Sequence, residues 1–175
     1  MIVGTENLRD MFAILHDGVI VRCDPFDANL ELNVEILYLA QRVNLGYRGF
    51  RVVLQNVCEL SFTTWPSDLT SPPDQIKSLL EIFAPELDIL GCEIEKDTLK
   101  VTCNQSSPKW NYCGGELCLK ADSASVTDPG GKEYSIEELG RLSDEYWNEW
   151  QRSGGSSPAP TFATLVIPPT SAKTK

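Results

Sequence analysis

Hydrophobic and polar residues alternate along most of the chain, but three stretches follow the period of a helix instead. The first is residues 5–15, where apolar side chains recur at i, i+3, i+4 and i+7. This stripe consists of Leu8, Met11, Phe12 and Leu15. Thr5 has a side chain suited to an N-cap, so the pattern predicts an amphipathic helix that begins there.

Two further helices are predicted later in the chain. One starts after Ser71, with Pro72-Pro73 in its first turn and Pro85 at its end. Its apolar stripe is Ile76, Leu79, Leu80 and Phe83. The other has Ser135 and Glu138 at the spacing of a capping box, and two glycines end it. Its apolar face is Ile136, Leu139, Leu142, Tyr146, Trp147 and Trp150.

Period-two alternation predicts the strands, because successive side chains of a strand point to opposite faces. The alternating stretches are residues 19–23, 30–36, 50–62, 88–95, 98–104 and 115–121. Asn56 interrupts the apolar face of the third stretch, which is therefore either one bent strand or two strands. The last stretch either ends at 121 or continues to Val126. Lys96-Asp97 is the predicted turn of a hairpin.

These elements predict an α+β fold with a mostly antiparallel sheet of about seven strands and three helices, which are N-terminal, middle and C-terminal. The strands come in adjacent pairs, without the regular strand–helix–strand alternation that parallel sheets need. We expect residues 1–152 to form a single α+β domain. Residues 153–175 are rich in Ser, Pro and Thr, and we expect a flexible tail there.

Composition narrows the classes of partner. The chain has 15 Lys+Arg against 25 Asp+Glu, a net charge of −10, and a pI near 4.5. Binding to nucleic acid or to anionic membranes needs clustered basic residues, so neither partner is expected. No apolar run approaches the ~20 residues of a membrane-spanning helix. Residues 1–6 show neither the basic segment nor the following apolar segment of a secretory signal peptide. This predicts a cytoplasmic protein.

Candidate chemistry is sparse. His16 is the one histidine, and no GxSxG motif accompanies it, so its position at a helix end indicates packing or capping. Four cysteines fall in phase with apolar positions and are predicted to be buried: Cys23, Cys58, Cys92 and Cys103. Cys118 has the opposite phase and is expected to be exposed. The spacing fits no zinc site, and we predict no catalytic residue, metal or cofactor.

Acidic residues concentrate in two windows. Residues 74–97 hold seven acids against two lysines, and residues 133–149 hold six against one arginine. Clusters of this kind speed association with basic partners. The predicted partner-binding residues are Glu93, Glu95, Glu137, Glu138, Asp144 and Glu145. The alternative is a solvated surface that only keeps the domain soluble.

The first part of the chain also resembles a known group of proteins. Residues 15–21, with Leu15-His16-Asp17, are followed by the alternating segments 30–36 and 50–62. This order is similar to small bacterial α+β proteins that open with a helix, an LHD step and a β-meander. Several of these are grouped with immunity proteins of polymorphic toxin systems. The resemblance implies a protein that binds and blocks a toxin, and it carries over no contact residue.

Three functions are consistent with these observations. The first is a non-enzymatic binding protein, such as an immunity-type inhibitor of a basic toxin or another basic protein. The second is a hydrolase that uses carboxylates or a metal. The third is a structural or assembly module that donates the tail segment 161–167 as a strand to another sheet edge. The sequence leaves the oligomeric state open.

Overall fold

A computed structural model describes residues 1–68 and 70–154. Four helices and eleven strands occur in this part of the chain. The helices are α1 (Thr5–Ile14), α2 (Leu37–Val43), α3 (Leu79–Ile82) and α4 (Ile136–Arg152). The strands are β1 (Ile2–Val3), β2 (Val19–Phe26), β3 (Asn29–Glu35), β4 (Gly49–Gln55), β5 (Glu59–Pro66), β6 (Gln75–Ile76), β7 (Leu87–Glu95), β8 (Thr98–Asn104), β9 (Tyr112–Lys120), β10 (Ser123–Thr127) and β11 (Glu133–Tyr134).

All eleven strands belong to one sheet, in the order β1-β10-β4-β3-β2-β7-β8-β9-β5-β6, with β11 also paired to β10. Every strand pair of the described residues is antiparallel. The predicted α+β class with a mostly antiparallel sheet is therefore confirmed. The strand and helix counts are higher than predicted, partly because β1, β6 and β11 are only two residues long.

The sheet turns a corner where two neighbouring strand pairs bend together. β4 pairs with β10, and after the bend β5 pairs with β9. Asn56 lies at the bend with a positive φ of 53°. Its side chain donates a hydrogen bond to the carboxylate of Asp122 at 2.9 Å, which ties the two bends to each other. The stretch 50–62 is therefore two strands, and the strand over 115–121 does not continue to Val126.

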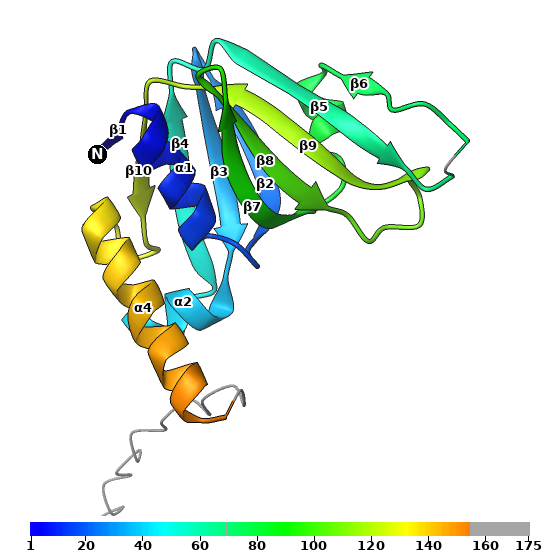
Figure 1. The fold of residues 1–175 in the computed structure, drawn as a ribbon. Coiled ribbons are helices and arrows are strands. Elements are labelled where there is room, and N and C mark those ends of the chain that lie inside the picture. Colours follow the sequence, from blue (N-terminus) through cyan, green and yellow to red (C-terminus); the bar gives the residue numbers. More distant parts are fainter. Residues whose placement is uncertain (69, 155–175) are drawn as a thin grey trace, which may run out of the picture.

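Helix α1 supplies the centre of the core. Leu8, Met11, Phe12 and Leu15 are fully buried, as the stripe in the sequence predicts. Figure 1 shows α1 lying against the sheet beside β7, with β10 and β4 on its other side. The cap of this helix differs from the prediction. Gly4 precedes the first turn and Thr5 is already helical. Gly4 has a φ of 93°, which glycine adopts without steric cost.

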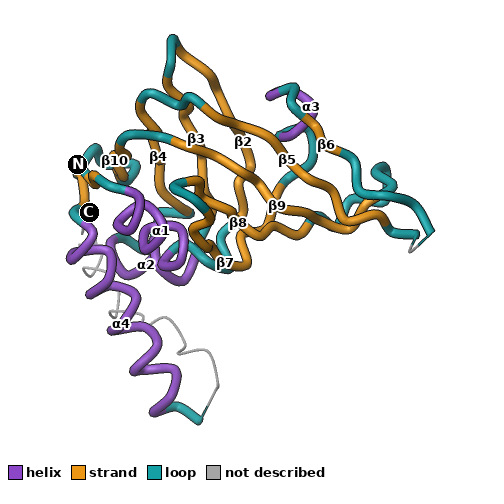
Figure 2. Tube along the Cα trace, turned by 45° about the horizontal axis from the view of Figure 1, so that its top comes forward, coloured by secondary structure: helices purple, strands orange, loops and turns teal. Residues whose placement is uncertain are grey.

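Helix α4 begins as predicted. The Ser135 hydroxyl accepts from the backbone N–H of Glu138, and the Glu138 carboxylate accepts from the backbone N–H of Ser135. The helix packs on α1 and α2. Figure 2 shows these three helices at one side of the molecule, while α3 and β6 lie at the other. Residues 155–175 lie outside the described residues, and with them nearly all of the predicted tail and its 161–167 segment.

The predicted middle helix was largely wrong. Gln75–Ile76 forms the strand β6, with Ile76 opposite Phe62 of β5, and only Leu79–Ile82 is helical. Pairing with an adjacent strand therefore overrides the helical spacing of the apolar residues. Leu80, assigned to the buried stripe, is 82% exposed. Helix α2 was not predicted at all, since its seven residues are too few for a periodic pattern.

The cysteines also depart in part from the prediction. Cys103 is completely buried, whereas Cys23 and Cys92 are partly buried. Cys58 was expected in the core but is exposed, because it lies in the short connection between β4 and β5 and not in a strand. Cys118, expected to be exposed, is partly buried.

Candidate functional site

An aromatic group lies on the surface where α4 crosses α2 and the end of α1. We name it the α4 aromatic surface, and its members are all partly exposed: His16, Tyr38, Tyr146, Trp147 and Trp150. The ring of His16 stacks on Trp147 with centroids 5.4 Å apart, and Tyr38 stacks on Tyr146 at 4.2 Å. Trp150 meets Trp147 edge-on at 5.8 Å. Stacked and edge-on contacts are the preferred geometries of aromatic pairs, so these rings form one continuous patch.

The amphipathic sequence of α4 produces this patch. The first turns bury Leu139 and Leu142 against the body of the protein. The same stripe then continues with aromatic residues, but here the helix extends past the sheet (Figure 1). Among the elements of residues 1–68 and 70–154, only α1 and α2 have extensive contacts with α4, and the later residues of its apolar stripe are partly exposed there.

His16 is fixed as part of this surface. Its Nδ1 donates to the carbonyl oxygen of Ala13 at 2.8 Å, and its Nε2 lies 3.6 Å from the carboxylate of Asp17. The Tyr38 hydroxyl donates to the carbonyl oxygen of His16 at 3.2 Å, and burial raises the pKa of Tyr38. These contacts agree with the packing role that the position of His16 at a helix end predicts.

Charged residues border the aromatic rings. Arg42 of α2 donates to both carboxylate oxygens of Glu149, at 2.9 and 2.6 Å, and its Nε lies 4.0 Å from Glu145. The hydrogen bond from Arg42 lowers the pKa of Glu149 from its ordinary value. Arg141 also pairs with Glu145, at 3.0 Å. Asp144 is exposed on the other flank of the helix. The patch therefore has an acidic rim that includes two paired arginines, Arg42 and Arg141.

Four of the six predicted partner-binding residues lie on α4: Glu137, Glu138, Asp144 and Glu145. Glu138 is already engaged, by the capping box and by Lys132 at 2.9 Å. Glu145 is engaged by the two arginines of the rim. Glu137 and Asp144 are exposed, and within residues 1–68 and 70–154 neither forms an ion pair. These two carboxylates are the ones most open to a partner.

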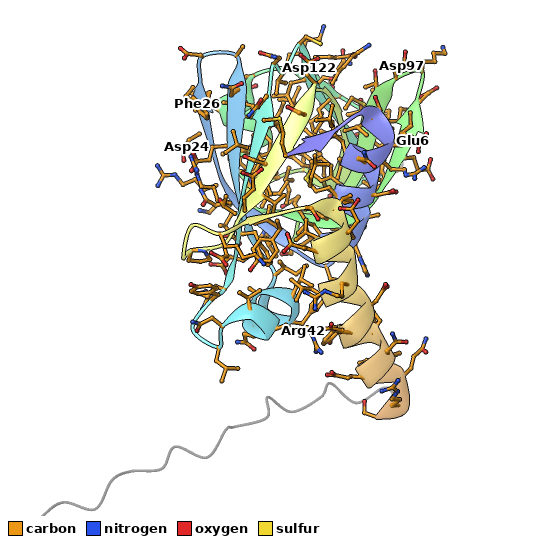
Figure 3. The ribbon with its side chains drawn as sticks, turned by 90° about the vertical axis from the view of Figure 1, so that its left-hand side faces the viewer. Glu6, Asp24, Phe26, Arg42, Asp97 and Asp122 are labelled. Carbon is orange, nitrogen blue, oxygen red and sulfur yellow. The ribbon has the colours of Figure 1, made fainter. Side chains whose placement is uncertain are left out.

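The other two predicted residues, Glu93 and Glu95, lie on β7. Glu95 pairs with Lys100 of β8, and Glu93 is directly opposite Lys100 in the sheet register. Asp97, two residues beyond Glu95, lies at the opposite end of the molecule from Arg42 and the end of α4 (Figure 3). The Asp97 end of the first acidic window therefore lies far from the end of α4 (Figure 3).

The sequence interpretation missed Tyr38 and Arg42, because it missed the helix that carries them. Arg42 and Glu149 are 107 residues apart, so their pairing leaves no local pattern. The aromatic end of the α4 stripe was visible, but its exposure depends on where the sheet ends. That boundary is a property of the whole fold.

In the part of the chain that the structure describes, no group of three or more His, Cys, Asp or Glu side chains is arranged to hold a metal ion. Among the same residues, no helix is both long and apolar enough to cross a membrane. The chain matches no protein-family model, no curated protein and no solved structure. Fold and surface together define an α+β protein with one bent antiparallel sheet and a partly exposed aromatic surface on its last helix.

Proposed function

We propose that this chain is a cytoplasmic protein-binding module that acts by docking on a basic protein rather than by turnover. The α4 aromatic surface is the proposed interface. In its specific form, suggested by the resemblance of residues 1–65, the module is an immunity-type inhibitor of a basic toxin.

The observation that carries the proposal is the position of Trp147 and Trp150 on a helix that extends past the sheet. Trp, Tyr and Arg are the residues that most often dominate the energy of protein–protein interfaces. The patch combines these types with a polar rim. Tyr146 and Trp147 are held by stacking on Tyr38 and His16, so little of their side-chain freedom remains to be lost on binding.

Charge supports a basic partner. Residues 136–152 contain five acidic residues against two arginines, a net charge of −3 on one helix. The whole chain carries −10, so its field attracts basic proteins at long range and repels acidic ones.

The test compares variants as baits for proteins of the native host. Wild type, Trp150→Ala and Trp110→Ala are immobilised, and captured proteins are eluted by rising salt. In parallel samples the captured proteins are cross-linked to the bait. Trp110 lies beside Tyr112, away from α4, and controls for the loss of any tryptophan. We expect one basic protein to bind stoichiometrically to wild type and Trp110→Ala and to be lost from Trp150→Ala.

A second pair of variants tests the electrostatic part with the purified partner. Glu137→Lys with Asp144→Lys should slow association at low salt, and the difference should shrink at high salt because ions screen the interaction. Neither residue belongs to the capping box of Ser135 and Glu138, but Glu137 is hydrogen-bonded to Ser135, so circular dichroism of the variant checks that the helix is kept. Equal capture by all three baits, or unchanged association kinetics, would contradict the proposed interface.

A further inference from the structure

A second surface lies away from α4, on the outer face of four adjacent strands. Side chains from β2, β3, β4 and β10 form one row across the sheet, with Arg22 opposite Asn33, Asn33 opposite Arg51, and Arg51 opposite Thr127. Neighbours in such a row lie about 5 Å apart. Asn33 alternates with the buried Leu32, so this row faces outward from the core.

This row is part of a cleft of about 730 Å³, which we name the arginine cleft. The segment 46–49 and the turn 128–131 contribute to its lining. The two segments touch, because a Cβ built on Gly130 would lie only 2.5 Å from the hydroxyl of Tyr47. The Asp128 carboxylate also accepts hydrogen bonds from Tyr134 and from the backbone N–H of Lys132. These contacts hold the turn 128–131 beside the segment 46–49.

Three arginines gather in this cleft. The described residues hold all 25 acidic residues of the chain but 13 of its 15 basic ones, because Lys173 and Lys175 lie outside them. Three arginines line the cleft against two carboxylates, Glu35 and Asp128. Asp128 is buried and already has donors. Asp24 and Glu31, just outside the lining, pair with Arg22 and Arg51, so the cleft is distinguished by its guanidinium donors and not by its net charge.

Each arginine is anchored by a carboxylate on one edge of its guanidinium group. Arg22 uses Nε and Nη2 for Asp24, which lies on the same strand (Figure 3). Arg48 likewise donates from Nε and Nη2 to Glu35, at 3.2 and 3.0 Å. Arg51 donates from Nη2 to Glu31 at 2.5 Å.

The other edge of each group is left for a ligand. Within the described residues, Nη1 of all three arginines and Nε of Arg51 have no protein acceptor. Guanidinium groups bind carboxylate and phosphate oxygens through such paired donors. An anchor on one edge also reduces the side-chain entropy lost when the other edge binds.

From this arrangement we infer that the arginine cleft binds the oxyanion group, carboxylate or phosphate, of a small-molecule ligand. Arg51 lies in the row between Asn33 and Thr127 and supplies the central donors. Arg22 and Arg48 supply donors from either side. This site is separate from the proposed interface on α4, and it holds whether or not that interface is correct.

The test is an NMR titration of the ¹⁵N-labelled protein with inorganic phosphate and, separately, with succinate. Sodium chloride keeps the ionic strength constant, so general screening is the same throughout. We expect saturable shifts of the arginine Nε–Hε signals and of the amides in 128–131. Arg51→Gln should weaken binding about tenfold or more, as for the loss of a charged hydrogen bond. Arg51→Lys should restore only part of it, because lysine lacks the planar fork.

Arg141→Gln is the matched control, since it removes another exposed arginine–glutamate pair and leaves the cleft intact. Saturation by phosphate alone identifies a phosphate ligand, and saturation by succinate alone identifies a carboxylate. The inference is overturned if neither anion shifts these signals beyond chloride. Equal weakening by Arg51→Gln and Arg141→Gln, or by neither, also overturns it.

Discussion

Individual cysteine side chains lie in very different surroundings. Cys103 is completely buried under α1, and burial raises the pKa of its thiol to about 12. Burial likewise raises the pKa of the Cys92 thiol to about 12. Cys58 and Cys113 are exposed to solvent, and they lie far apart along the chain. Since the thiolate is the reactive form, these differences set the order in which the thiols react.

We therefore expect iodoacetamide at neutral pH to label Cys58 and Cys113 first and Cys103 only when the protein unfolds. Mass spectrometry of peptides after increasing labelling times measures this order. Cys58→Ser identifies the fast site by its removal and leaves the core unchanged. Labelling of Cys103 at the same rate as Cys58 in native buffer would show that the region beneath α1 opens readily.

Side-chain alternation predicted burial where a residue lies inside a regular strand, as for Cys103. It failed at Cys58, because phase has no meaning in a connection between strands. The same limit applies to the candidate interface. Parity indicates that Glu93 and Glu95 face outward, but the partner of an exposed carboxylate comes from another element. Lys100 is adjacent in the sheet and could be inferred, whereas the pairing of Arg42 with Glu149 could not.

At the scale of elements, the approach of β3 to β4 depends on a glycine. Gly49 is the first residue of β4 and pairs with Glu35. A Cβ at this position would lie 1.9 Å from the carbonyl oxygen of Val34, which real side chains never do. In contrast, a Cβ at Gly91 of β7 would meet nothing within 4 Å.

Gly49→Ala should therefore destabilise the protein by roughly 1–3 kcal/mol, the usual cost of forcing an atom into a packed site. Gly91→Ala is the control and should change the free energy of unfolding by about 0.5 kcal/mol or less. Urea denaturation of the three proteins measures both values. If Gly49→Ala is as stable as Gly91→Ala, then β3 and β4 separate at this end more easily than their register indicates.

Elements with long, regular patterns were predicted correctly: α1, the β2–β3 and β7–β8 hairpins, and α4. The segment 75–82 was not, because its apolar residues satisfy a short strand and a short helix equally well. The neighbouring strand β5 favours the strand, because Phe62 lies opposite Ile76 across the sheet. The residues that decide between strand and helix lie outside the segment 75–82, so its own sequence does not predict which one forms.

At the scale of the whole molecule, α1 connects parts of the sheet that the strands join only weakly. β2 and β7 are paired through Val19–Ile20 and Leu87–Asp88 alone. Helix α1 contacts β7 and β8 on one side and β1 and β10 on the other. Its buried face therefore links β7 and β8, in the middle of the strand order, to the β1–β10 end in one hydrophobic core.

Phe12→Ala should remove about 3–5 kcal/mol of stability, as for other fully buried phenylalanines. Because Phe12 belongs to the shared core, unfolding should remain one cooperative step when it is followed by tryptophan fluorescence and by far-UV circular dichroism. Leu80→Ala is the control, since Leu80 is 82% exposed, and it should be nearly neutral. Two separate transitions in Phe12→Ala would mean that the sheet consists of two independently stable parts.

Strand β10 also has a consequence for the synthesis of the protein on the ribosome. Its sheet neighbours β1 and β4 are both made early, but β10 follows only after β5 to β9. Until residues 123–127 emerge, the edge of β4 that they occupy has no strand to pair with. A growing chain with an open strand edge is exposed to association with its neighbours on the same messenger. The emergence of β10, after β5 to β9, is therefore the step that closes this edge.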